Sequence, residues 1–300
     1  MQPIDAFIVG VPKAGTTWLA NTMSQHSQIQ ISDPKEPNII SSHKGTFDRI
    51  LREPNWLDYE NCFTKNGLRI DASVHTFACP LSPKRIFNKI PDMKFILCLR
   101  EPISRTISHW SMVRDTKSDI ENNVDWSDFL IAWSDDRLKS SSLYGQCMER
   151  WLEYFSIDSF LIIDSKHMRN EPNKILSQVE TFLNLDSHDY SINLQKHANS
   201  ASDRRPLTAL GKLFRYAFSI IPKTIKKPIV NKLQSIDLNI YSMPIISGKP
   251  KIRKVNKNYY KICSNIVIND LIKFEKLTGY STAHWITEIN QYSSDSNQIS

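Results

Sequence analysis

The chain has 300 residues, enough for one large α/β domain or two small ones, and its 40% hydrophobic and 23% charged residues are globular values. Its formal net charge of +7 suits an anionic cofactor or substrate, and no DNA- or RNA-binding motif accompanies it, so nucleic acid is not an expected partner. The five cysteines are odd in number and form no CxxC or His/Cys cluster, so neither a zinc site nor a disulfide framework is expected.

The first predicted element is the apolar run Phe7–Val11, which is typical of a buried parallel strand. A loop containing Gly15 follows, and then a helix start. Such a unit presents backbone N–H groups to a phosphate. The spacing from Gly10 to Gly15 matches the nucleotide P-loop GxxxxGK[ST], but Thr16 stands at its lysine position and the loop lysine is Lys13. The loop is therefore predicted to bind phosphate with its lysine in an unusual place.

Two further strands are predicted near residues 30 and 69. The first leads into Asp33–Asn38, where two prolines prevent a helix and leave an exposed loop with one lysine and the carboxylate of Glu36. The second strand ends in the polar segment Asp71–His75. Residues 46–66 are expected to form a helix and a loop.

The clearest buried strand is Lys94–Leu99, which runs into Arg100 and a predicted helix from about 103 to 114. Functional groups in open α/β sheets gather where strands end, and a guanidinium can bind phosphate with two hydrogen bonds. Arg105, one turn into this helix, either joins the same ligand or pairs with a carboxylate of the protein.

The remaining chain predicts a helix over 143–155, a strand near 160, and helices over 172–185 and 258–277, the last ended by Gly279. Alternating strands and helices predict an α/β fold: a single P-loop-like domain over residues 1–286, with a central, mainly parallel sheet flanked by helices. A basic helical insertion is expected at about 207–250 and a polar C-terminal tail at 287–300.

Two motifs resemble one family. Residues 12–19, Pro-Lys-Ala-Gly-Thr-Thr-Trp-Leu, resemble the 5′-phosphosulfate loop of sulfotransferases that use 3′-phosphoadenosine 5′-phosphosulfate (PAPS), above all the Golgi glycan enzymes and bacterial ones. Residues 100–110 resemble the 3′-phosphate motif of this family, with Arg100 and Ser108 at its ligand positions. The resemblance covers roughly residues 5–286 and implies PAPS as donor, adenosine 3′,5′-bisphosphate (PAP) as product and no metal.

The resemblance also implies site residues. Those expected to bind the donor are Lys13, Ala14, Gly15, Thr16, Thr17, Trp18, Arg100, Ser108, Lys196 and Arg204. Lys13 is also expected to act in catalysis, by stabilising the phosphate as it leaves.

For the catalytic base, the segment Lys35–Ile40 fits a Lys-Glu segment of the glycan enzymes, which implies Glu36. Cytosolic family members use a histidine, for which this chain offers His43, His75 and His109. A lysine that touches the sulfate in many glycan enzymes is replaced by Ala72, and Asp71 or His75 is expected to meet the acceptor instead.

The predicted function is sulfuryl transfer from PAPS to a hydroxyl group, of a carbohydrate or glycolipid. The alternatives are a P-loop nucleotide kinase and a non-catalytic nucleotide- or polyanion-binding protein. The acceptor, a small molecule or a glycan, is expected to meet residues 38–66, 74–82, 114–142 and 207–250. Residues 207–232 are a candidate contact with a membrane surface or an acidic glycan.

No signal-peptide pattern and no run of 18 apolar residues occurs, so a cytoplasmic protein is expected. The lack of the N-terminal anchor found in animal Golgi sulfotransferases suggests a bacterial enzyme or a trimmed catalytic domain.

Overall fold

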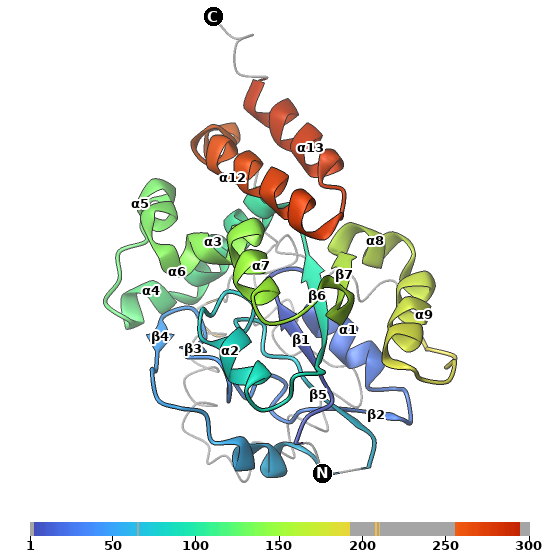
Figure 1. Cartoon of the computed structure of the whole chain (residues 1–300). Helices are drawn as coiled ribbons and strands as arrows, with labels where there is room; N and C mark the ends of the chain where they lie inside the picture. The colour runs from blue at the N-terminus through green and yellow to red at the C-terminus, as the bar shows by residue number, and fades with distance from the viewer. Residues whose placement is uncertain (1–2, 65, 193–207, 209, 211–255, 295–300) are drawn as a thin grey trace, which may run out of the picture. The chain divides into compact units, whose positions relative to one another are not determined.

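A parallel five-stranded sheet forms the centre of the computed structural model, which describes residues 3–64, 66–192, 208, 210 and 256–294 (Figure 1). Its order is β2-β5-β1-β6-β7, and every neighbouring pair is parallel. The strands are β1 (Ala6–Gly10), β2 (Ile29–Ile31), β5 (Leu68–Asp71), β6 (Lys94–Leu99) and β7 (Phe160–Asp164). All five lie where the sequence predicts strands, and the predicted α/β fold is confirmed.

The strand order reverses at β1. From β1 the chain passes to β2 and β5 on one side of it, and then to β6 and β7 on the other. Connections after β1 and β6 therefore leave the sheet in opposite directions, which opens a crevice at the carboxyl ends of these strands. This edge carries the predicted donor loop and Arg100.

Helices cover the sheet. In Figure 1, α1, α8 and α9 lie on one side of it, and α2, α3 and α7 on the other. The α-helices are α1 (Thr16–Met23), α2 (Ser82–Phe87), α3 (Pro102–Thr116), α4 (Ser118–Glu121), α5 (Phe129–Ser134), α6 (Asp136–Lys139), α7 (Tyr144–Leu152), α8 (Ser165–Asn170), α9 (Pro172–Leu183), α12 (Lys257–Thr278) and α13 (Ala283–Ser294). Among the described residues, none of these helices has the length and apolar character needed to span a membrane.

The shorter elements are a two-stranded antiparallel hairpin and three 3-10 helices. They are β3 (His43–Lys44), β4 (Asp48–Arg49), η1 (Trp56–Cys62), η2 (Ser140–Ser142) and η3 (Ile157–Ser159).

The core is built on both faces of the central strands. All five residues of β1 are buried, as expected for a strand covered on both sides. On β6, the ring centroid of Phe95 lies 4.8 Å from those of Trp151, Phe155 and Phe160. These aromatic contacts join β6 to α7 and β7, and so fix the strand that presents Arg100.

The start of α3 is set by the residues that follow Arg100. The carboxylate of Glu101 accepts hydrogen bonds from the N–H groups of Ile103 and Ser104, both at 2.7 Å, and Pro102 occupies the first turn. The Tyr260 hydroxyl donates to the same carboxylate at 3.0 Å and joins α12 to α3. Burial raises the pKa of Glu101, while these hydrogen bonds oppose that rise.

Three predicted segments differ in detail from the structure. Residues 46–66 contain the expected helix as the 3-10 helix η1, and also the strand β4, which was not predicted. Residues 114–142, which are expected to meet the acceptor, also contribute Trp126 and Leu138 to a second small core, where both are fully buried. The expected polar tail is helical up to Ser294, since α13 extends through these residues and buries Ile289.

Candidate active site

The loop between β1 and α1 leaves the first amides of α1 facing outward. Gly15, the N-cap residue, has φ 87°, a left-handed conformation that favours glycine, and provides no side-chain cap. A Cβ on Gly15 would lie 3.3 Å from the sulfur of Met168. The loop is held by main-chain bonds from Val11 N to Cys98 O at 2.7 Å and from Ala14 N to Val11 O at 3.2 Å. With no acidic residue in its first turn, α1 offers an anion site at the sheet edge.

The predicted donor-loop side chains are divided between the core and the surface. Ala14 and Thr16 are buried, Thr17 is exposed, and Trp18 packs partly against the core. The Lys13 ammonium lies 3.9 Å from the sulfur of Met112 on α3. The loop lysine therefore extends towards α3, the helix that also carries Ser108.

Arg100 stands directly after β6, next to the loop that follows β1. It is half-buried, and its carbonyl accepts the Tyr144 hydroxyl at 2.7 Å. Burial, followed by the charge of Arg169, lowers the pKa of Arg100. The nearby carboxylate of Glu101 is already bonded within the protein, and among the described residues no carboxylate forms an ion pair with the Arg100 guanidinium. A cation in this state fits a phosphate ligand.

Ser108 and Arg105 lie on the same helix but in different surroundings. Ser108 is almost fully buried on α3. The Arg105 guanidinium is fully buried and donates to Ser142 Oγ at 2.6 Å and to the Leu138 carbonyl at 3.1 Å. Arg105 thus fastens α3 to α6 and η2. No carboxylate of the described residues pairs with Arg105, so the alternative of an ion pair is wrong for this part of the chain.

On the other half of the sheet edge, the loop after β2 is tied to the segment after β5. The Lys35 ammonium donates to Glu36 Oε1 at 2.8 Å and to the Ala72 carbonyl at 3.2 Å. Asn38 N donates to Ser73 Oγ at 3.0 Å. A third of the Glu36 side chain is exposed (34%), so its carboxylate is held in place yet reachable.

The three candidate histidines are poor bases. Burial is the largest cause in each case: it lowers the pKa of His43 to about 4, that of His75 to about 3, and that of His109 well below its usual value. A general base works best when its pKa lies near the operating pH. His75 and His109 are also buried, whereas a third of the Glu36 side chain is exposed, so Glu36 is more accessible to an acceptor than these two rings.

The hydrogen bonds of His109 fix its tautomer. Arg105 Nη1 donates to His109 Nδ1 at 3.1 Å, and a guanidinium can only donate. The neutral ring then carries its hydrogen on Nε2, which donates to Thr46 Oγ1 at 2.8 Å. Both ring nitrogens are occupied, so His109 is part of the protein scaffold beside the site.

The two predicted acceptor contacts are both buried. The carboxylate of Asp71 accepts the Tyr59 hydroxyl at 2.6 Å and Ser73 N at 2.7 Å, and burial raises the pKa of this carboxyl. With both oxygens bonded internally, Asp71 holds the segment after β5 in place, and its expected contact with the acceptor is not supported. The ring of His75 lies 6.1 Å from that of His109.

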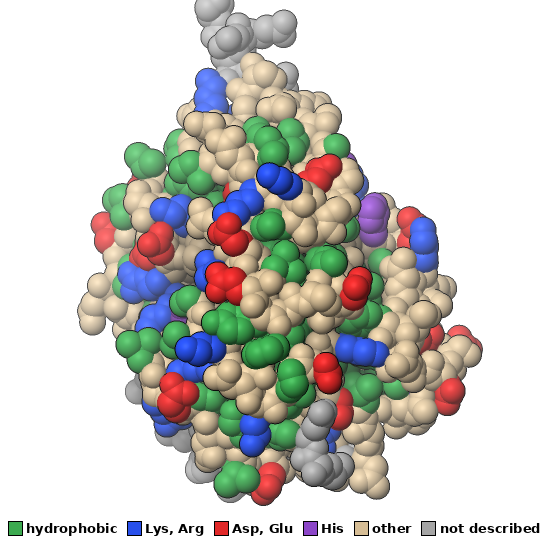
Figure 2. Space-filling view, in the orientation of Figure 1, with side chains coloured by type: hydrophobic (Ala, Val, Ile, Leu, Met, Phe, Trp, Pro, Cys, Tyr) green, Lys and Arg blue, Asp and Glu red, His purple; other side chains and the backbone are tan. Residues whose placement is uncertain are grey.

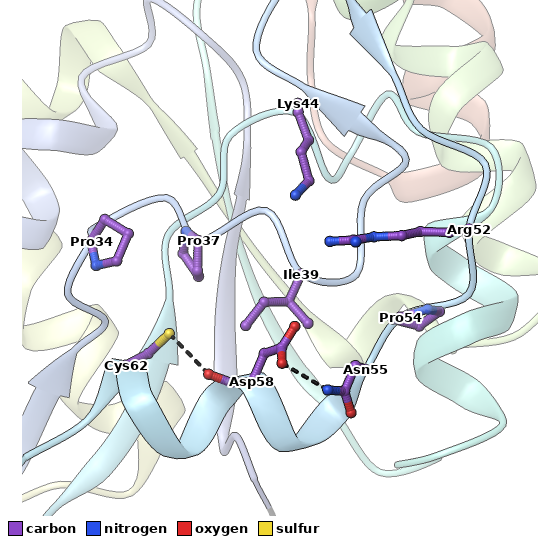
Figure 3. A pocket seen from close by; sticks show the side chains of 9 residues that line it. All are labelled: Pro34, Pro37, Ile39, Lys44, Arg52, Pro54, Asn55, Asp58 and Cys62. Carbon is purple, nitrogen blue, oxygen red and sulfur yellow. Dashed lines mark hydrogen bonds between the residues drawn. The ribbon is translucent and has the colours of Figure 1, made fainter.

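A cavity of about 200 Å³ adjoins the Glu36 loop (Figure 3). Pro34 and Pro37 lie at one side of it, and the side chains of Lys44 and Arg52 point into it. Asp58, on η1, accepts a hydrogen bond from Asn55 Nδ2 at 2.7 Å in the wall below. This cavity lies largely within residues 38–66, one of the segments expected to meet the acceptor.

Asp164, the strand-end aspartate of β7, is bonded to the protein through both carboxylate oxygens. They accept Lys166 N at 2.5 Å and contact His284 Nε2 at 2.9 Å. A kinase would use such a residue to hold magnesium. Throughout the described part of the chain, no group of three or more His, Cys, Asp and Glu side chains is arranged to hold a metal ion.

Sequence reasoning missed Arg169 and Met112. Arg169 lies on α8 after β7, and its charge reaches Arg100; Met112 contacts Lys13 from the last part of α3. Arg169 follows a predicted strand of the parallel sheet, and this position could have indicated a site residue. Nothing in the sequence indicated Met112. The expected donor contacts Lys196 and Arg204, and nearly all of the basic segment 207–232, lie outside the described residues.

Comparisons with known proteins agree with this geometry. The sulfotransferase domain family matches residues 3–205. Heparan sulfate glucosamine 3-O-sulfotransferase 5 of Mus musculus is 27% identical over 202 residues, which cover 64% of this chain and 57% of that protein. Bifunctional heparan sulfate N-deacetylase/N-sulfotransferase 1 of Caenorhabditis elegans is 21% identical over 244 residues, covering 78% of this chain and 28% of that protein. The chain thus spans about half the length of the first of these relatives and less of the second.

A solved structure, a sulfotransferase from Alicyclobacillus acidocaldarius, superimposes with a TM-score of 0.61 and 16% identity, covering 94% of this chain and 98% of the other. This likeness supports the fold.

Proposed function

Because the chain belongs to the sulfotransferase domain family, we propose that it transfers a sulfuryl group from PAPS to a hydroxyl group of a carbohydrate. One observation carries the proposal. The anion-binding loop after β1 and the arginine after β6, which has no carboxylate ion-pair partner among the described residues, lie at the carboxyl ends of neighbouring parallel strands. A donor with phosphate groups at both its 5′ and 3′ positions needs two such sites. Two relatives named for sulfation of heparan sulfate support a carbohydrate acceptor.

The donor half of the site consists of residues after β1 and β6. When bound, PAPS supplies a sulfuryl group attached to a phosphate that leaves. The amides at the start of α1 hold this phosphate, and Lys13 stabilises the charge that grows on it during transfer. Arg100 and Ser108 hold the 3′-phosphate.

The acceptor half consists of residues after β2 and β5. Glu36 takes the proton of the attacking hydroxyl group. Lys35, bonded to Glu36 at 2.8 Å, keeps this carboxylate in one orientation and supplies positive charge beside it. The ammonium also bonds the carbonyl of Ala72, so Lys35 provides a cation close to where the glycan enzymes carry their lysine.

The kinase alternative finds less support, since Thr16 replaces the P-loop lysine and Asp164 is bonded internally. The cytoplasmic location and the membrane or glycan contact of residues 207–232 stay predictions.

Calorimetry with PAP, together with transfer of radiolabelled sulfate from PAPS to a panel of carbohydrates, tests the proposal. Glu36→Gln is expected to keep PAP affinity and to lower turnover by roughly 100-fold or more, because a positioned base contributes about this factor. Lys13→Ala should also lose turnover, while Glu121→Gln, at an exposed carboxylate of α4, serves as the matched control. Failure to bind PAP, or full turnover by Glu36→Gln, would refute the proposal. Magnesium-dependent hydrolysis of ATP would favour the kinase.

A further inference from the structure

A second, larger cavity of about 520 Å³ lies between the β3–β4 hairpin, residues 78–80, α6 with η2, and α7. Four of its twelve lining residues are cationic, namely Arg49, Arg137, Lys139 and Arg150, and one, Asp136, is anionic. On the face shown in Figure 2, Lys and Arg side chains also gather over the hairpin and the neighbouring helices. The cavity is therefore positively charged.

Within the described part of the chain, carboxylates neutralise two of these cations. Arg137 forms an ion pair with Asp135 at 2.6 Å, and Lys139 forms one with Asp136 at 3.2 Å. Arg49 donates to the carbonyl of Asp48 at 2.8 Å rather than to a carboxylate. Its Nη1 makes this bond and also donates to the Gly45 carbonyl at 3.5 Å, and among the described residues Nε and Nη2 form no hydrogen bond.

Arg150 is the second cation that forms no ion pair among the described residues. Its Nη1 donates to the Gln146 carbonyl at 3.0 Å, and its Nη2 donates to the Ala78 carbonyl at 3.3 Å and to the Cys147 sulfur at 3.4 Å. Its buried Nε has no hydrogen-bond partner among the described residues. The nearby carboxylate of Asp270 accepts hydrogen bonds from Gly145 N at 2.7 Å and Gln146 N at 2.9 Å. A buried donor without a partner is costly unless a ligand satisfies it.

The pKa of His43 reflects the positive charges that line this cavity. Burial, followed by the charges of Arg49 and Arg150, lowers its pKa to about 4, so its ring is neutral at neutral pH. Burial and then the charge of Arg137 lower the pKa of Arg49, while Cys79, Asp135 and Asp48 raise it by smaller amounts. These like charges repel one another, and a bound anion would reduce this repulsion.

We propose that this cavity is a second anion site, in which Arg49 and Arg150 bind a compact oxyanion such as a sulfate or a carboxylate group. It is distinct from the donor site. Ala78 and Pro80 line the cavity, and they belong to the segment after β5 that also carries His75. The cavity thus adjoins the site on the side of this segment. The oxyanion is either part of the acceptor, an assignment that rests on the proposed function, or a free ion.

Titration with inorganic sulfate in the presence of saturating PAP tests the site. PAP occupies the donor loop, so sulfate bound at that loop does not contribute to the response. Sodium chloride at equal ionic strength corrects for general salt effects. Sulfate is expected to raise the melting temperature of the wild type, and Arg49→Gln should need at least tenfold more sulfate for the same shift. Arg69→Gln, at an arginine of β5 that lines neither cavity, is the matched control and should respond like the wild type.

Equal responses of the wild type and Arg49→Gln, or none in either, would overturn the proposal. PAP affinity, measured for each variant, reports that the fold is intact. If PAP does not bind at all, the proposed function fails, and the dependence of the sulfate response on Arg49 still decides the cavity.

Oligosaccharides of one length, one neutral and one bearing carboxylate and sulfate groups, identify the source of the anion. An acceptor-borne anion predicts that the charged sugar binds more tightly than both the neutral sugar and inorganic sulfate, and that Arg49→Gln removes this preference. A free ion predicts that inorganic sulfate binds as tightly as the charged sugar. Equal binding of both sugars without any sulfate response contradicts the site.

Discussion

Replacing Arg100 by alanine should weaken the binding of PAP far more than the binding of AMP, which lacks the 3′-phosphate. Arg100 is half-buried, and among the described residues its guanidinium forms no ion pair, so a phosphate would be its main anionic partner. Loss of one member of a buried, hydrogen-bonded charge pair costs about 2–5 kcal/mol. The partial exposure of Arg100 favours the lower part of this range, so we expect about 2–3 kcal/mol, or roughly 30- to 160-fold in Kd.

The measurement is a double-mutant cycle by calorimetry, with the wild type and Arg100→Ala each titrated with PAP and with AMP. Arg100→Lys keeps the charge but loses two-pronged binding of phosphate, and should fall between them. Arg69→Ala, near the amino end of β5 and away from the site, is the matched control. If Arg100→Ala weakens PAP and AMP by the same factor, Arg100 does not bind the 3′-phosphate and this assignment is wrong.

Three further predictions concern the donor loop, the base and the fold. Gly15→Ala should lower the free energy of unfolding by about 1–3 kcal/mol, because φ is 87° and Met168 lies 3.3 Å from the new Cβ; an unchanged urea midpoint would contradict this. Lys35→Met should lower kcat by roughly tenfold or more at unchanged PAP affinity, because it frees the Glu36 carboxylate, whereas Lys35→Arg should recover part of the rate. Burial raises the pKa of Asp270 from 3.8 to about 6, so its contribution to stability is full below pH 4 and is lost as the pH rises through 6. Between pH 4 and 7 the free energy of unfolding of the wild type should therefore fall by roughly 3 kcal/mol more than that of Asp270→Asn. If the unfolding free energies of the two proteins change with pH in parallel, this prediction is wrong.

The sheet and the donor loop could be predicted because their signals are local. A strand such as β6, buried on both faces, is a short apolar run whose ends are marked by a charged residue and a loop. The donor loop is likewise defined by a few neighbouring residues. One of them, Gly15, occupies a left-handed backbone position that favours glycine.

What the sequence did not indicate depends on distant partners. The environment of Arg105 is formed by Ser142 and Leu138, more than thirty residues away, so its burial without a carboxylate could not be foreseen. The strands β3 and β4 have two residues each, too few for an alternating pattern. In α13 only Trp285 and Ile289 are buried, and the polar remainder of the helix concealed its helical period.

The central place of β1 has a consequence for how such a protein can diversify. In the proposed function, the residues that hold the donor follow β1 and β6, whereas Glu36 and the cavity beside it belong to segments after β2 and before β5. This proposal assigns the two recognition tasks to opposite halves of one sheet edge. Exchange of residues 33–62 between related chains should redirect the choice of acceptor while the nucleotide is still bound, which makes this segment a natural unit for grafting new specificity.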